Sequence, residues 1–256
     1  MKTIINFSTF LIAIVPLAFV LLLSSCEKTD GPNLNSAYPA PSYTTPSDAD
    51  VLLVAVKTSA ASPITMPSIP GFPMDDVFLE IGMGVAVFKD KGKADKVVLN
   101  DTELTYTNGV YTWTPNFTNI TDPESVTGIQ FDYGVNWKIS NPNITKNISG
   151  FPSMPKITSG KTVAKNEDFT VTNNSISSAQ KVLYAIYSED GKYVMKEVDG
   201  NSRSCTFTKA ELSVLKKGSN GMVQANAYTI KDETIGGKKV YFINQSSYTI
   251  TGVTIE

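Results

Sequence analysis

Few residues in this 256-residue chain could carry covalent or acid–base chemistry. It contains two cysteines, Cys26 and Cys205, and no histidine. The absence of histidine excludes Ser-His-Asp and Cys-His catalysis and every histidine-based metal site. Chemistry based on a pair of carboxylates stays possible, because the chain has 24 acidic residues. No calcium loop of the DxDxDG type is present, so we predict no metal site and no bound cofactor.

Cys26 follows a segment that is typical of secretory signals. Lys2 is the only charged residue before it, the run from Phe10 to Leu23 is apolar throughout, and two serines come next. A positive start, an apolar middle and small residues at a cleavage point make up a signal peptide. A transmembrane helix is one alternative, but a span needs about 20 apolar residues, and that length admits polar ones here. An ordinary signal peptide followed by a chance cysteine is the other alternative.

The tetrapeptide Leu23-Ser24-Ser25-Cys26 resembles the lipobox of bacterial lipoproteins. The resemblance implies a signal peptide of residues 1–25, cleavage before Cys26, and lipid on the cysteine sulfur and on the new amino terminus. One acyl chain holds a protein at a membrane only marginally, whereas two or more hold it stably. The charged residues at 27–30 resemble the export signal of Bacteroidota-type surface lipoproteins. We therefore expect a lipid-anchored protein in the outer membrane, exposed at the cell surface.

The anchor is expected to continue into a flexible tether. Residues 26–50 are rich in Pro, Ser, Thr and Asn and show no apolar period. If largely polyproline-like, such a segment reaches about 70 Å at about 3.1 Å per residue. The rest of the chain has a single arginine, Arg203. Recognition of phosphates and bases favours arginine, so nucleic acid is excluded as a partner.

Alternation of apolar and polar residues between turn signals predicts an all-β chain. We expect two β-sandwich domains, residues 51–150 and 156–256. In the second, about seven strands in about 100 residues resemble an immunoglobulin-like or fibronectin-III-like sandwich. The Pro-rich loop 58–76 is expected to fold over the end of the first sandwich. The clearest strand expectations are 51–56, 85–88, 96–99, 168–172, 181–188, 193–198, 204–207, 222–230, 239–244 and 248–255.

Three local patterns predict geometry in more detail. Asn108-Gly109 predicts a two-residue hairpin turn, whose register pairs Tyr106 with Tyr111 and Leu104 with Trp113 on one face. Thr208-Lys209-Ala210-Glu211 has the capping-box pattern that begins a short helix. A third pattern, the alternation over 128–140, predicts a half-buried strand, or two joined by a bulge at Gly134.

Three aromatic residues are candidate ligand-binding residues: Trp113, Tyr111 and Trp137. One interpretation is a platform on which sugars stack. The other is core packing, because each residue lies on the apolar face of its predicted strand. Tyr133 is predicted on the same face as Trp137. Cys205 alternates with polar neighbours and is predicted to be a buried structural thiol.

The function expected from these features is that of a non-catalytic binding or adhesion module whose ligand is a glycan or a protein. A structural subunit of a surface assembly is the alternative, because lipoprotein fimbrial subunits resemble this plan of lipobox and two β-domains. Subunits matured by an arginine protease carry an arginine past the lipid cysteine, whereas Arg203 is the only arginine here. A carboxylate-dependent glycosidase is a third hypothesis, supported only by aromatic and acidic residues.

Overall fold

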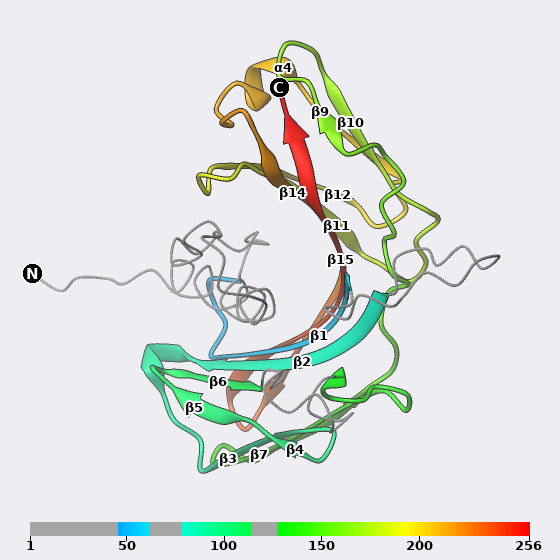
Figure 1. The fold of residues 1–256 in the computed structure, drawn as a ribbon. Helices are drawn as coiled ribbons and strands as arrows, with labels where there is room; N and C mark the ends of the chain where they lie inside the picture. The colour runs from blue at the N-terminus through cyan, green and yellow to red at the C-terminus, as the bar shows by residue number, and fades with distance from the viewer. Residues whose placement is uncertain (1–45, 62–77, 114–126) are drawn as a thin grey trace, which may run out of the picture.

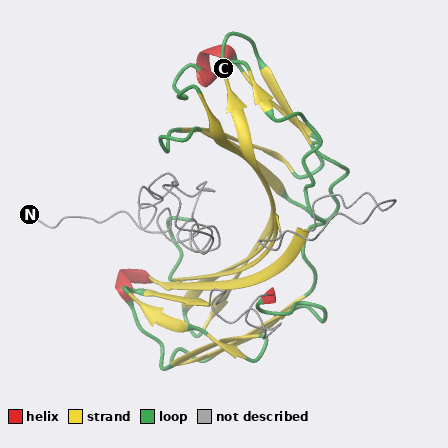
Figure 2. Cartoon of the chain, viewed as in Figure 1, coloured by secondary structure: helices red, strands yellow, loops and turns green. Residues whose placement is uncertain are grey.

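The structure is a computed structural model that describes residues 46–61, 78–113 and 127–256. Strands make up most of this part of the chain (Figure 2), which confirms the predicted all-β class. The signal peptide, Cys26 and the tether as far as residue 45 lie outside the described residues. So do residues 62–76 of the predicted Pro-rich loop 58–76. Its first residues belong to a strand, because β1 extends from Val51 to Ala61.

The strands of the described residues form three sheets. The longest, called here the long sheet, has nine strands in the order β12-β11-β14-β15-β1-β2-β6-β5, with β9 paired to the far end of β15. A four-stranded sheet has the order β4-β3-β7-β8, and β10 and β13 form a two-stranded sheet. The bounds are β1 Val51–Ala61, β2 Phe78–Phe88, β3 Lys96–Leu99, β4 Thr102–Glu103, β5 Thr105–Thr107, β6 Val110–Trp113, β7 Val135–Ser140, β8 Ile144–Ile148, β9 Thr162–Val163, β10 Phe169–Thr172, β11 Lys181–Tyr187, β12 Tyr193–Asp199, β13 Ser204–Phe207, β14 Gly218–Ile235 and β15 Lys238–Ile255.

The strands β14 and β15 form a hairpin of 18 residues on each side, longer than the sequence predicts. Its turn is Gly236-Gly237, where both φ angles are positive, as a tight hairpin turn requires. The predicted strands 239–244 and 248–255 are parts of one strand. The prediction broke β15 at Gln245, Ser246 and Ser247 because they interrupt the apolar pattern, yet they pair with β14 and are buried.

The same hairpin joins the two halves of the chain. β15 pairs in parallel with β1 from Val51↔Val240 to Ser59↔Tyr248, and β1 pairs with β2 in antiparallel fashion. Main-chain hydrogen bonds therefore cross the division expected between domains 51–150 and 156–256. Figure 1 shows the long sheet bending through both halves, with the other two sheets on the outside of the bend.

Each half packs its own hydrophobic core against the outer face of the long sheet. In the first sandwich the four-stranded sheet covers the long sheet, and in the second the two-stranded sheet and a short helix do so. The first core comprises Val51, Leu53, Ala55, Ala86, Phe88, Ala94, Val97, Leu99, Leu104, Tyr111, Ile129, Phe131, Val135, Trp137, Ile139, Ile144, Ile148, Val240 and Phe242. The second comprises Ile157, Val163, Val171, Val182, Tyr184, Ile186, Cys205, Phe207, Leu212, Leu215, Val223, Ala225, Ala227, Tyr248, Val253 and Ile255.

The hairpin β5–β6 has the predicted register, with Tyr106 opposite Tyr111 and Thr107 opposite Val110. Tyr106, Tyr111, Leu104 and Trp113 all pack in the first core, so the predicted common face is confirmed. Cys205 is also as predicted, a buried free thiol within the second core.

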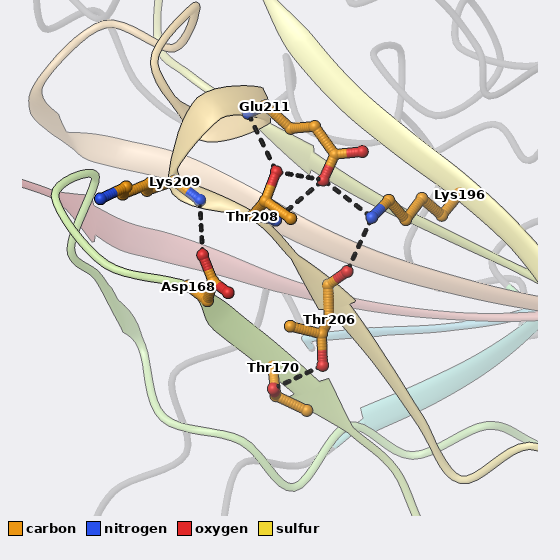
Figure 3. A network of polar contacts seen from close by, with 7 residues as sticks. All are labelled: Asp168, Thr170, Lys196, Thr206, Thr208, Lys209 and Glu211. Carbon is orange, nitrogen blue, oxygen red and sulfur yellow. Dashed lines mark hydrogen bonds and ion pairs between the residues drawn. The ribbon is translucent and has the colours of Figure 1, made fainter.

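The predicted helix start is confirmed at α4, Lys209–Leu212. Thr208 caps it, and the Glu211 carboxylate accepts hydrogen bonds from the Thr208 N–H (2.8 Å) and from Lys196 Nζ (2.7 Å). Lys196 also donates to the Thr206 carbonyl at 2.8 Å, so the helix is tied to β12 and β13 (Figure 3). Held in this way, the helix packs its buried residue Leu212 into the second core.

Candidate functional site

The three predicted aromatic residues lie at the first core rather than on an open platform. The exposed fraction of the side chain is 3% for Tyr111 and 1% for Trp137, and Trp113 is half-buried against the same core. The Tyr111 hydroxyl accepts from the Ala94 N–H at 3.0 Å, and burial raises the pKa of this phenol. Of the two interpretations of these residues, the structure supports core packing, and the sugar platform is corrected because Tyr111 and Trp137 are inaccessible to a ligand.

Tyr133 departs most from its predicted position. The alternating pattern places it on an apolar face beside Trp137, yet its side chain is 94% exposed. The strand β7 begins only at Val135, and residues 131–134 form a turn in which the Gly134 N–H donates to the Phe131 carbonyl. Gly134 has a φ of 101°, which glycine adopts without strain. Because Tyr133 lies in this turn and not in a strand, the alternation that predicts its burial does not apply to it.

A side chain from a distant turn holds this exposed turn in place. Asn100 Nδ2 donates to the carbonyls of Gln130 (2.6 Å) and Gly134 (2.8 Å). Its Oδ1 accepts from the Asn136 N–H at 2.7 Å. Asn100 itself has a φ of 45°, which asparagine tolerates better than most residues. Three hydrogen bonds from one side chain therefore fix the loop that carries Tyr133.

Tyr133 is one of the residues that line a cleft of about 590 Å³ on the outer side of the sheet. The cleft lies where the first sandwich meets the segment 149–154 that leads into the second. Its lining combines aromatic, charged and small polar side chains. The lining residues are Lys57, Glu80, Phe131, Asp132, Tyr133, Gly134, Ser149, Gly150, Phe151, Pro152, Ser153, Met154 and Ser246.

The wall formed by segment 149–154 is fixed to the long sheet by side chains of β15. Asn244 Nδ2 donates to the Gly150 carbonyl at 2.8 Å, and the Ser246 hydroxyl donates to the Pro152 carbonyl at 2.6 Å. These bonds explain why polar residues interrupt the apolar pattern of β15. They place the Phe151 ring 4.8 Å from the Phe131 ring, between centroids. The Phe151 side of the cleft is therefore held against Phe131 before any ligand binds.

Charges of both signs surround these rings. Lys57 Nζ lies 5.4 Å from the centroid of Phe151, within the range of a cation–π contact. Glu80 and Asp132 are exposed carboxylates in the same lining. The cleft therefore offers an open aromatic face together with hydrogen-bond donors and acceptors. A ligand with an apolar face and a rim of hydroxyl groups fits this combination.

Other candidate sites in the described residues have fewer features of a ligand site. A second cavity of about 620 Å³, lined by Lys165, Glu167 and Glu256 among others, contains no aromatic side chain. Among the described residues no cluster of three metal-ligating side chains occurs. The described helices also include none that is long and apolar enough to cross a bilayer.

Sequence reasoning did not find the residues of this cleft, apart from naming Tyr133 among the aromatics. Asn100, Lys57, Phe151 and Ser246 come together only through long-range pairing. A local signal existed at Asn100-Asp101, an asparagine–aspartate pair typical of a turn, where both φ angles are positive. That signal predicts a turn but does not reveal which loop the Asn100 side chain binds.

Comparisons with known proteins add little to this geometry. No family model matches the chain, and no curated protein matches it either. Among solved structures, the fibronectin(III)-like modules of Clostridium thermocellum CbhA match with 13% identity and a TM-score of 0.24. The match covers 68% of this chain and 85% of that one.

Proposed function

We propose that this protein is a non-catalytic binding module, anchored by lipid at the surface of the outer membrane, which holds a glycan in the cleft at Tyr133. The observation that carries the proposal is the exposed Tyr133 on a turn that Asn100 fixes. A rigid aromatic ring loses little conformational entropy on binding, since it has only two rotatable side-chain bonds. Ligand sites are usually concave and largely preformed, with a few placed polar groups.

The ligand class follows from the lining of the cleft. A pyranose presents one apolar C–H face and a rim of hydroxyl groups. The Tyr133 ring can stack on that face, while Lys57 donates to hydroxyl oxygens and Glu80 and Asp132 accept from hydroxyl protons. The charges in the lining have both signs, which favours a neutral glycan over a highly charged one. The chemistry proposed is binding alone.

Glycan binding can be tested on the mature chain with Cys26→Ser, which removes the proposed lipid site. The protein is applied to a glycan array, and each positive glycan is then titrated. Tyr133→Ala should reduce affinity about tenfold or more, equivalent to about 1.4 kcal/mol, without changing the melting temperature. Val214→Ala is the matched control, because Val214 is also an exposed apolar residue, on the second sandwich. Unchanged binding by Tyr133→Ala would refute the cleft.

Asn100 gives a second variant for the same titration. Asn100→Gly keeps the freedom to adopt positive φ but removes all three side-chain hydrogen bonds to the turn. We expect weaker binding with Tyr133 still present, because the turn is no longer preorganised. Glycan turnover by the parent protein, lost in Glu80→Gln or Asp132→Asn, would instead favour the glycosidase hypothesis.

Membrane anchoring is tested separately. Cells expressing the full chain or its Cys26→Ala variant are labelled with an alkyne fatty acid and fractionated. The parent should label and sediment with outer membranes, and the variant should do neither. A variant that still labels would show that Cys26 is not the lipid site, and the cleft would remain a separate question.

A further inference from the structure

The inner, concave face of the long sheet carries a third apolar cluster. The other layers of both sandwiches lie outside the bend of the long sheet (Figure 1). Because side chains alternate along a strand, those of β1, β2, β11, β14 and β15 that do not enter the two cores point inward. We call this surface the inner face. Its buried apolar residues are Leu52, Val54, Val56, Ile81, Met83, Val85, Val87, Val110, Leu183, Tyr228 and Ile243, with Met195, Ile230 and Tyr241 packed against them.

These side chains are as buried as those of the two cores. Leu52, Val54 and Ile243 are each 0% exposed. Every member of the cluster belongs to a strand of the long sheet, so no second layer comes from the described residues. An apolar sheet face is stable only when another layer covers it. The cover must therefore be a segment outside the described residues or a partner.

A stripe of polar side chains crosses the middle of the inner face. Gln245 Nε2 and the Ser247 hydroxyl both donate to Asn226 Oδ1, at 3.1 and 2.6 Å. Within the described chain, Asn226 Nδ2 and Gln245 Oε1 have no hydrogen-bond partner, and neither has the Thr58 hydroxyl. The exposed fractions of these three residues are 1%, 2% and 0%. Unpaired buried polar atoms are destabilising, so the cover should supply backbone donors and acceptors.

Several tyrosines line the inner face. Tyr228 and Tyr241 belong to the apolar cluster. Tyr187 and Tyr193 extend it along β11 and β12, with ring centroids 5.6 Å apart. Aromatic-lined grooves bind proline-rich segments in the polyproline II conformation. Such segments form no internal hydrogen bonds, so their backbone groups are free to pair with the polar stripe.

The described chain begins at the rim of the inner face. Asp48 Oδ1 accepts from the Tyr241 hydroxyl at 2.9 Å, and Asp50 Oδ2 accepts from the Lys239 N–H at 2.8 Å. Ala49 between them is 2% exposed. The residues that precede Pro46 therefore start out beside Tyr241, where a segment could run directly onto the face.

We propose that residues 27–45, part of the segment 26–50 that the sequence predicts to be a flexible tether, bind along the inner face of their own sheet. The segment contains Tyr38-Pro39-Ala40-Pro41-Ser42-Tyr43, a proline-rich stretch with aromatic residues at both ends. From β12 to β6 the face spans six inter-strand spacings, roughly 29 Å. Nineteen residues in polyproline II reach roughly 59 Å. The segment is therefore long enough to cross the face, and this inference does not depend on the glycan cleft.

Cross-linking between the tether and the two faces of the protein tests this. The Cys26→Ser chain receives Ala40→Cys together with Met195→Cys, which is half-buried on the inner face. The matched control pairs Ala40→Cys with Thr145→Cys, an exposed position on β8 outside the bend. A short bismaleimide should give several-fold more intrachain product with Met195→Cys than with Thr145→Cys. Adding Pro39→Ser and Pro41→Ser should remove that difference.

Two outcomes would overturn the proposal. Equal cross-linking to both faces would mean that the tether is free, and products between chains would mean that a second copy covers the inner face. Chymotrypsin cleavage after Tyr43 needs no added cysteine and covers the case of a misfolded variant. When the segment is bound, this site should be cut many-fold more slowly than in a peptide of residues 27–45. Cutting at the peptide's rate would refute the binding.

Discussion

The two sandwiches of this protein bury comparable cores but assemble them from different stretches of chain. Every core residue of the second sandwich lies between Ile157 and Ile255. The first core uses residues 51–148 and in addition Val240 and Phe242, which come from the far end of the chain. Its central strand β1 also takes β15 as a hydrogen-bonded neighbour. The second sandwich is therefore self-contained, whereas the first depends on the second for a strand and part of its core.

The largest expected effect is on the thermal unfolding of the two halves of the chain when each is produced alone. Residues 156–256 should melt cooperatively, because they retain the complete second core. Residues 46–155 should show no cooperative transition, because they lack Val240, Phe242 and the partner of β1. Circular dichroism with thermal denaturation of each fragment is the measurement. A cooperative melt of 46–155 would mean that the borrowed strand is dispensable.

A smaller effect is expected from single core truncations. Phe242 lies in the first core and Phe207 in the second, 2% and 0% exposed. Either change to alanine should destabilise by about 3–5 kcal/mol. Both tryptophans, Trp113 and Trp137, pack in the first core, so their fluorescence follows the first sandwich alone.

Because the sandwiches share β15, Phe207→Ala should lower the midpoint of the tryptophan transition as well as the midpoint followed by circular dichroism. Phe242→Ala is the matched variant in the first sandwich, which contains both tryptophans. If Phe207→Ala leaves the tryptophan midpoint unchanged, the first sandwich is not coupled to the second through the shared sheet.

The smallest effect concerns the helix cap of the second sandwich. The Lys196 ammonium, followed by the Thr208 N–H, lowers the pKa of Glu211 from 4.5 to about 2. Since the folded pKa lies below the unfolded one, the stabilisation is complete above about pH 4.5 and is lost as pH falls towards 2. Glu211→Gln should lower the melting temperature slightly near pH 7, and this difference should vanish near pH 2.

Glu103→Gln is the control for this measurement, because it removes an exposed ion pair with Lys96 in the first sandwich. Its melting temperature should change less than that of Glu211→Gln at neutral pH, since the Glu211 carboxylate also caps a helix. A difference between Glu211→Gln and the parent that persists near pH 2 would contradict the role of the charge.

The parts predicted well from sequence depend on neighbours in the chain. Lys96–Leu99 and Ser204–Phe207 are strands with the predicted bounds, and Asn108-Gly109 fixed the register of its hairpin. In each case the alternating residues and the turn residues that determine the structure are neighbours in the chain, so the sequence alone predicts the element. The cap at Thr208 is local in the same way.

The parts missed depend on contacts between distant residues. Asn100 holds residues 130–134 out of a continuous strand by bonding to backbone groups 30 to 36 positions away. Gln245 and Ser246 look like a strand break in sequence, because the groups to which they donate hydrogen bonds lie in β14 and in segment 149–154. The parallel pairing of β1 with β15 likewise has no local signature. The candidate cleft depends on the Asn100 contacts, on Ser246 and on this parallel pairing, so the sequence could not locate it.

The double pairing of β1 also determines how the molecule bears mechanical load. β1 lies between β2, with eleven paired positions, and β15, with nine. The proposed anchor would pull on β1 from its amino end, along the strand axis, while a bound ligand holds the cleft. That pull loads both ladders in shear, so many hydrogen bonds must break together before the strand slides. Forced unfolding is governed by the barrier to such concerted rupture, and β1 is placed to make that barrier high.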